Sequence, residues 1–315
     1  MLLLRAELIK LNRPLLWGVS AAAALFCVLL AVGGAHNVTQ FSARSAGPVP
    51  GCAQRLPQRP AGTTCAQAEA SARTRLAQYL AQPAQVAAQL TPAAAGAEAA
   101  GLMASLPGAL ALALLAGGHA GGEWSGRTIK NVLIAHGRRW QVLAAKLASL
   151  WLAGVGLIAA CWLALAVAGP LIARAGHLPG PRQSVAAGLS LAGSQAARAL
   201  LVLAAFAMIG LLVAVLTRST IGATAGTAGT VVAMLVAAVL PGLGRWTPAT
   251  WVQGWMGFPA GLGSVTPLPT NFWSRFIPAA GAGPGQVFGL AGLAALLAGC
   301  GAVAAWSFRR SDVTG

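Results

Sequence analysis

The sequence predicts an all-α integral membrane protein. We expect six transmembrane helices, an N-terminal interfacial helix, a charged cytoplasmic helix between spans two and three, and a large extracellular loop between spans one and two. Of the 315 residues, 57% are hydrophobic and 8% are charged, whereas soluble domains carry about 25% charged residues. Several apolar runs approach the roughly 20 residues that are needed to cross the hydrocarbon core. A soluble helical protein is excluded, because so few charges do not cover a soluble surface.

The N-terminal residues 1–14 are predicted to form an amphipathic helix in the membrane interface. One stripe of this helix carries Leu4, Leu8, Leu11 and Leu15. Glu7 and Lys10 lie off that stripe, and a frayed extension of the first span is the alternative.

The first span is predicted at 15–35. Arg5, Lys10 and Arg13 precede it, so the positive-inside rule places the N-terminus in the cytoplasm. The run is long for the apolar region of a secretory signal and lacks a convincing cleavage site, so we expect the span to be retained.

Residues 36–100 are predicted to form the extracellular loop. The loop begins with Pro, Gly and Ser and continues as Ala- and Gln-rich, helix-forming sequence broken by Pro83 and Pro92. Cys52 and Cys65 are the cysteines clearly outside the apolar runs, and in an oxidising compartment they are expected to form a disulfide. The remaining cysteines lie in apolar runs, and no cysteine or histidine cluster has the spacing of metal ligands.

The second half of the chain alternates apolar runs with short connections. We expect a second span at 101–120, a cytoplasmic segment at 121–141, spans three to five within 142–240, an aromatic outer re-entrant or interfacial region at 241–285, a sixth span at 286–308 and a cytoplasmic tail at 309–315. The fifth span opens with IGATAGTAGT, a Gly/Thr face on which helices can approach closely.

The most charged short segment is 123–146, which lies between two apolar runs and which we call the connector. If a helix starts near Ser125, Arg127, Lys130 and Arg138 share its polar face. Its apolar face carries Ile129, Leu133, His136, Trp140 and Leu143. A generic amphipathic loop anchored by positive charges is the alternative.

The same segment resembles a known family. The pattern consists of Glu123, Gly126, Thr128, Lys130, Leu133, Arg139 and Lys146. It is similar to the first inner loop of the permease subunits of type 2 ABC exporters, except that Arg127 separates the Gly from the Thr. The start RAELIKLNRPLLW resembles the entry helix of that family, and the aromatic stretch 246–276 lies where the family has outer re-entrant helices.

The resemblance implies a homodimeric permease in a bacterial cytoplasmic membrane, with both termini in the cytoplasm. Two copies of a separate ABC ATPase subunit would bind ATP and Mg, because this chain has no Gly-x-x-x-x-Gly-Lys-Ser/Thr loop. The chain is therefore not expected to be an enzyme or to hold a cofactor itself. Segment 121–141 would be the cytoplasmic coupling helix. The residues expected to couple to the ATPase are Glu123, Arg127, Lys130, Arg138 and Arg139, with Glu7 as a secondary candidate.

The expected cargo is hydrophobic or amphipathic, such as a drug, antibiotic, peptide or lipid, in keeping with multidrug or antibiotic resistance. The net charge of +16 is scattered among loops, which points to anionic membrane lipids and not to nucleic acid. Three alternatives stay open: a membrane anchor or sensor subunit without transport, a secondary transporter or channel, and an intramembrane enzyme. The last two normally require ionisable residues within the spans.

Overall fold

The structure is a computed structural model that describes residues 2–11, 14–45, 64–126, 128–129, 139–180, 184–239, 243–257 and 285–310. These residues form α-helices and one short 3₁₀ helix, with no strand among them. The elements are α1 (Leu2–Leu11), α2 (Pro14–Ser45), α4 (Cys65–Gln89), α5 (Ala95–Ala104), α6 (Leu106–Ser125), α8 (Arg139–Ala175), α9 (Val185–Thr217), α10 (Thr220–Val239), η2 (Gly244–Trp246), α11 (Pro248–Met256) and α13 (Gln286–Arg310).

Five helices are long and apolar enough to cross a membrane, and α5 together with α6 makes a sixth candidate. The five are α2, α8, α9, α10 and α13. The prediction of an all-helical chain is therefore confirmed for the described residues, and the length and composition of these helices are compatible with a multi-pass membrane protein.

Helices α5 and α6, which overlap the second span predicted at 101–120, meet at an angle of 61°. Ser105 is extended, with φ −66° and ψ 164°, and ends α5. Pro107 has no amide hydrogen to continue the ladder of α5, and its ring clashes with the preceding turn, so a new helix starts at this point.

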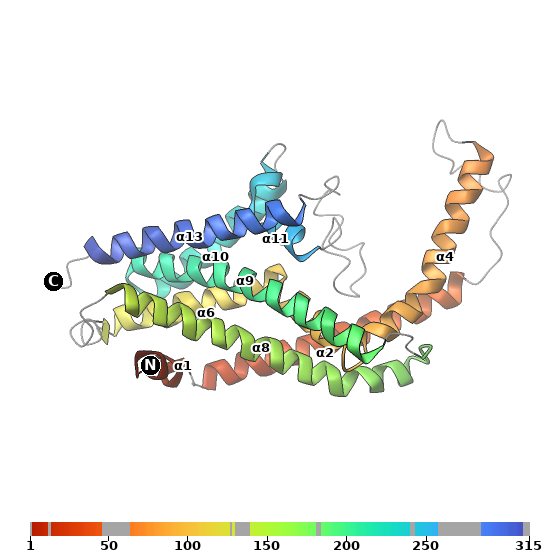
Figure 1. The fold of residues 1–315 in the computed structure, drawn as a ribbon, viewed down its shortest axis with the longest axis horizontal. Helices are drawn as coiled ribbons and strands as arrows, with labels where there is room; N and C mark the ends of the chain where they lie inside the picture. The colour runs from red at the N-terminus through yellow and green to blue at the C-terminus, as the bar shows by residue number, and fades with distance from the viewer. Residues whose placement is uncertain are drawn as a thin grey trace.

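The long helices run lengthwise beside one another, as Figure 1 shows. Helix α6 packs against α9 and α10, α2 packs against α8, and α13 packs against α9 and α11. The last turn of α6, the first turn of α8, helix α1 and the last turn of α13 lie at one end of the bundle, while α4 projects from the opposite end. We call the end of the bundle that holds α1 and these three helix turns the connector end.

Residues 36–100 contain more helix than the predicted loop. Helix α2 continues to Ser45, and α4 runs through Pro83 without ending, so the break expected at that proline does not occur. The segment also ends inside the bundle, because α5 packs against α8 and α9. Small side chains permit this contact: a Cβ at Gly96 would lie 2.8 Å from the Cβ of Ala192.

The predicted disulfide stays a prediction, because Cys52 lies outside the described residues. Cys27, Cys161 and Cys300 carry free thiols, and the first two are buried, as expected for cysteines in apolar spans.

The aromatic region is described in part. Helix η2 and α11 fall within 241–285, and α11 packs against α13. Trp255 of α11 donates its indole N–H to the backbone oxygen of Arg198, at 3.0 Å. Residues 258–284, which include Phe258, Phe272, Trp273 and Phe276, lie outside the described residues.

The close approach of α6 and α10 depends on glycines. A Cβ at Gly117 would lie 3.0 Å from Thr227 Oγ1, and a Cβ at Gly121 would lie 2.9 Å from the Cβ of Ala223. The Gly/Thr-rich opening of the fifth span thus packs closely against another helix, as expected, and the facing glycines belong to α6.

Helix α1 lies within the segment 1–14 that was predicted to be helical, but only part of the leucine stripe is buried. Glu7 is 1% exposed, whereas Leu8 of the stripe is 37% exposed. Leu11 is buried in the main core. A carboxylate is buried in this way only when charged partners compensate for its lost hydration, so the surroundings of Glu7 define the site.

Candidate functional site

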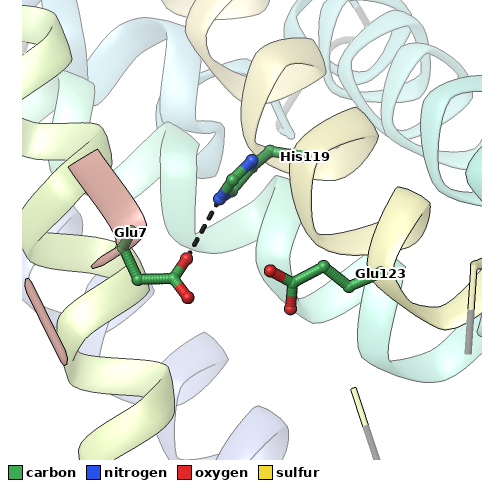
Figure 2. A group of neighbouring side chains, drawn as sticks. All are labelled: Glu7, His119 and Glu123. Carbon is green, nitrogen blue, oxygen red and sulfur yellow. Dashed lines mark hydrogen bonds and ion pairs between the residues drawn. The ribbon is translucent and has the colours of Figure 1, made fainter. Parts of the chain in front are cut away.

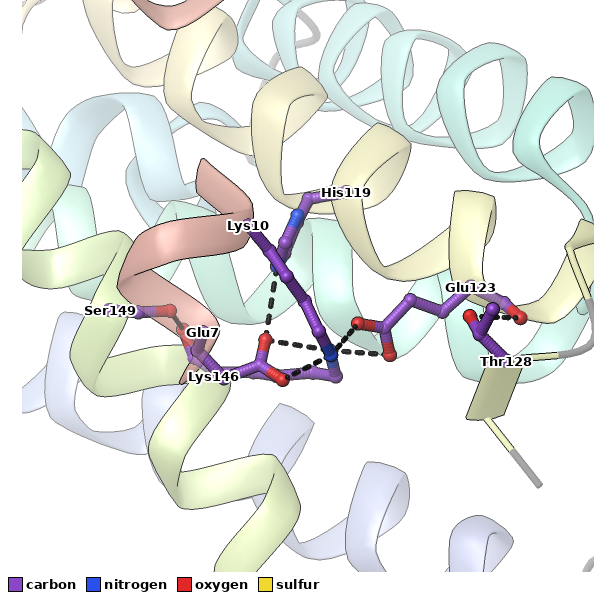
Figure 3. Close-up of polar contacts among 7 residues, drawn as sticks. All are labelled: Glu7, Lys10, His119, Glu123, Thr128, Lys146 and Ser149. Carbon is purple, nitrogen blue, oxygen red and sulfur yellow. Dashed lines mark hydrogen bonds and ion pairs between the residues drawn. The ribbon is translucent and has the colours of Figure 1, made fainter. Parts of the chain in front are cut away.

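Five ionisable side chains meet at the connector end, where α1, α6 and α8 come together (Figure 3). Helix α1 contributes Glu7 and Lys10, α6 contributes His119 and Glu123, and α8 contributes Lys146. Residues three or four apart lie on the same face of a helix, which is the spacing of the pair on α1 and of the pair on α6. Local helical geometry therefore directs both pairs into one place, which we call the ion cluster.

Two ammonium groups bridge two carboxylates in the ion cluster. Lys146 Nζ lies 2.9 Å from Glu7 Oε2 and 2.7 Å from Glu123 Oε2. Lys10 Nζ lies 3.0 Å from Glu7 Oε1 and 2.8 Å from Glu123 Oε1. The formal charges of these four groups sum to zero, so the ion cluster is balanced while His119 is neutral.

His119 and two hydroxyl groups complete the polar contacts. His119 Nε2 lies 3.1 Å from Glu7 Oε2, where its N–H can donate to the carboxylate. Ser149 donates to the backbone oxygen of Lys146 at 2.9 Å, one turn farther along α8. Thr128 donates to the backbone oxygen of Glu123 at 3.4 Å, so the first residues of the connector touch the ion cluster.

Three members of the ion cluster are buried, while the side chain of Lys10 is 32% exposed. The exposed fractions are 1% for Glu7, 4% for Lys146 and 7% for Glu123. Removing charges from water costs several kcal/mol per ion, and mutual attraction compensates for it only when pairing is close. Each carboxylate here contacts both ammonium groups, which provides that pairing.

The pairing sets the titration of Glu7 and Lys10. Burial alone would raise the pKa of Glu7, but the hydrogen bond with His119 and the charge of Lys146 outweigh it and hold that pKa well below its usual range. Burial alone would lower the pKa of Lys10, but its hydrogen bonds to Glu123 and Glu7 outweigh that effect and raise the pKa. Both residues are therefore held in their charged forms.

Glu7, His119 and Glu123 together have the donor types of a metal site (Figure 2). Their ligand atoms lie within 4.8 Å of one another, and the sequence spacing had not predicted this group. However, the ammonium groups of Lys10 and Lys146 already lie within 3.0 Å of carboxylate oxygens of the same group. A metal ion would meet two positive charges there, so the donor set fits internal ion pairs better than a metal.

The structure brings together two of the six side chains that the sequence nominated for coupling, Glu123 and Glu7. Of Arg139, the structure describes the backbone, as the first residue of α8. The other three nominated residues, Arg127, Lys130 and Arg138, lie outside the described residues. On the predicted apolar face of the connector, Ile129 and Leu143 are buried and Trp140 is 53% exposed, while Leu133 and His136 lie outside the described residues.

Sequence reasoning missed the roles of Lys10, His119 and Lys146. The sequence analysis used Lys10 only as one of the positive charges before the first span. It used Lys146 only as the last residue of the motif in the connector. The spacing of His119 four residues before Glu123 was the available signal, because it places both side chains on one helical face. Nothing in the sequence indicated that α1 would meet that face.

No protein-family model matches this sequence, and no curated protein or solved structure shows significant similarity to it.

Proposed function

We propose that this chain is the transmembrane permease subunit of an ABC exporter, which moves a hydrophobic or amphipathic substrate outward with ATP hydrolysed by a separate subunit. One observation carries the proposal. The ion cluster joins the N-terminal helix to both helices that flank the connector, because Glu7 and Lys10 of α1 contact Glu123 of α6 and Lys146 of α8. The entry helix and the connector are the segments that the motif resemblance assigns to contact with the ATPase.

The arrangement of the bundle supports the same proposal. Helix α1, the last turn of α6, the first turn of α8 and the last turn of α13 all lie at the connector end (Figure 1). In the proposed topology this end faces the cytoplasm of a bacterium and receives the ATPase. Arg127, Lys130, Arg138 and Arg139 would contact the ATPase, which binds the ATP and Mg.

In the proposed mechanism, closure of two ATPase subunits on ATP pushes on the connector. The ion cluster transmits this movement to α1, α6 and α8, and the bundle passes between inward-open and outward-open states whose populations depend on nucleotide. Each carboxylate already contacts two ammonium groups, so the helices can shift while each charge keeps one partner. A second copy of this chain would complete the pathway, and lipids would surround it.

The proposal is tested by purifying the affinity-tagged chain in mild detergent from the membranes of its own organism. We expect a second polypeptide with a phosphate-binding loop to co-purify, together with ATPase activity that vanadate inhibits. Replacing the lysine of that loop should abolish the activity. Full-length chain that purifies without any ATPase, and that moves cargo across vesicles lacking ATP, would contradict the proposal.

A second candidate is a secondary transporter driven by protons or ions, and one observation favours it. The buried Lys146 and the partly buried His119 lie on helices that are candidate spans. Glu98 lies on α5 of the bent pair, and broken helices often form ion sites in such transporters. Uptake driven by a pH gradient in proteoliposomes without ATP would favour this function over the first.

A further inference from the structure

Three consecutive residues at the end of α6 contact the ends of five other helices. Glu123 forms ion pairs with α1 and α8. Trp124 lies beneath the guanidinium of Arg218, whose Cζ is 5.5 Å from the ring centroid, and it also meets Phe308 of α13. Ser125 accepts a hydrogen bond from the amide of Thr220, the first residue of α10, at 2.9 Å.

Successive residues of a helix point about 100° apart, so residues 123–125 face three different sides of α6. One side holds the ion cluster, the second holds the aromatic contacts, and the third holds the start of α10. We propose that residues 123–125 form a junction through which the helix ends at the connector end open and close as one cooperative unit.

The contact with α10 completes the cap of that helix. The first amides of a helix have no partner within it. Ser219 accepts a hydrogen bond from the amide of Gly222 at 2.9 Å, and Ser125 supplies the acceptor for Thr220 from another helix. The hydroxyl of Thr220 also donates to Ser125 Oγ at 2.9 Å. The first turn of α10 is thus tied to the last turn of α6.

The contact between Trp124 and Arg218 joins α6 to the turn between α9 and α10. Arg218 ends α9 in the left-handed conformation, with φ 51°. This conformation is uncommon for a residue with a side chain, and here it directs the guanidinium over Trp124. The ring of Trp124 is also edge-on to Phe308, with centroids 6.1 Å apart and planes at 81°.

A small apolar cluster lies beneath Trp124 and joins the same helices. Its buried residues come from the connector, α8, α9 and α13, and Leu3 of α1 packs against it. The buried residues are Ile129, Val142, Val215 and Phe308. The junction therefore has an ionic side and an apolar side, and separating one pair of helix ends disturbs both.

Under the proposed function, the junction would carry movement of the connector to the C-terminal helices as well as to α1 and α8. That consequence rests on the proposed function, whereas the junction itself is tested without any ATPase. The test is hydrogen exchange of the full chain in lipid nanodiscs. Residues 220–223 of α10 are the reporter, because no described contact joins Trp124 to them directly.

We expect Trp124→Leu to accelerate exchange at 220–223 by about 2- to 5-fold, the effect of losing one exposed cation–π contact. The matched control is Trp306→Leu. Trp306 also lies near the end of α13 and has Arg310 4.2 Å from its ring centroid, but it is 56% exposed and its ring lies outside the junction. This control should leave exchange at 220–223 unchanged.

Two further variants keep the test decisive if Trp124→Leu fails to fold. Arg218→Gln removes the cation and keeps the tryptophan, and Ser125→Ala removes the acceptor of the Thr220 amide. Both should accelerate exchange in the last turn of α6 as well as at 220–223. Exchange that changes in one helix only, or that responds equally to Trp306→Leu, would overturn the junction. Neither of these two results would contradict the proposed transport function, which is tested separately by co-purification of the ATPase.

Discussion

Lys146 Nζ on α8 lies 2.9 Å from Glu7 Oε2 on α1, although 139 residues separate the two in the chain. Both residues are almost fully buried, with exposed fractions of 4% and 1%. The contact attaches the N-terminal helix to the bundle through charges.

Glu7→Gln should destabilise the protein by about 3–5 kcal/mol, because it leaves buried ammonium charge without its carboxylate. The loss is measured as a lower unfolding temperature in detergent or nanodiscs. The matched control is Glu69→Gln on α4, where the carboxylate lies 3.8 Å from Arg73 at the surface. Exposed pairs of this kind contribute little, so equal losses in the two variants would contradict the role of the ion cluster.

The stabilisation from Glu7 should depend on pH only under acidic conditions. Its pKa in the folded state is lowered, so its contribution is complete above the ordinary glutamate pKa of about 4.3 and is lost as pH falls toward the lowered pKa. The difference in unfolding free energy between wild type and Glu7→Gln should therefore stay constant from neutral pH to about pH 5 and narrow below about pH 4. A difference that narrows already between neutral pH and pH 5 would be inconsistent with this pairing.

The raised pKa of Lys10 has the opposite dependence. Its contribution is complete below the ordinary lysine pKa of about 10.4 and is lost as pH rises through the higher pKa of the folded state. We expect Lys10→Met to have the same relative stability at pH 7 and pH 9, measured by thermal unfolding. A relative stability that changes between these two values would show that the pKa of Lys10 is lowered in the folded state, which contradicts its pairing with the two carboxylates.

Glu123 and Lys146 should be energetically coupled. Each single variant, Glu123→Gln or Lys146→Met, leaves one net charge in the ion cluster, whereas the double variant leaves Glu7 and Lys10 paired. The double variant should therefore lose less stability than the sum of the single losses, by about 0.5–3 kcal/mol. Additive losses in this double-mutant cycle would mean that the 2.7 Å contact contributes no specific energy.

Gly121 on α6 should be intolerant of a side chain. A Cβ there would lie 2.8 Å from the backbone oxygen of Ser219 and 3.0 Å from the Cα of Thr220, so Gly121→Ala should cost about 1–3 kcal/mol by overpacking. Gly122→Ala is the control, because its Cβ would meet only Thr220 Oγ1 at 4.0 Å. Thermal unfolding should show the control neutral or slightly stabilised through helix propensity. A similar loss in both variants would argue against the close approach of α6 and α10.

Much of the fold was predictable, because apolar runs and their polar connections report directly on membrane-spanning helices. The sequence analysis did not predict the bend at Ser105. An apolar run indicates a membrane-spanning segment, but it does not indicate whether the helix axis changes direction within that segment. Pro107 was the available signal. The continuation of α4 through Pro83 was missed because proline propensity was treated as decisive when the surrounding Ala and Gln favour a helix.

The site was predictable only in part. Glu7 and Glu123 were nominated separately, and the structure places two lysines between them. A stripe of leucines suggested that Glu7 faced away from the buried side of α1, yet tertiary contacts with Lys146 and His119 bury it. Periodicity ranks faces by hydrophobicity, so it cannot identify a face that is buried by charge pairing between distant segments.

We propose that the ion cluster couples ATP hydrolysis to transport, and the ratio of transported cargo to hydrolysed ATP measures this coupling. It is measured in proteoliposomes containing the complex with the ATPase, for wild type, Glu123→Gln and the surface control Glu69→Gln, each reconstituted in equal amount. The account predicts that Glu123→Gln keeps its ATPase activity and lowers the ratio about tenfold, within the usual range of coupling energies, while the control matches wild type. An unchanged ratio in Glu123→Gln would contradict the proposed role of the ion cluster in coupling.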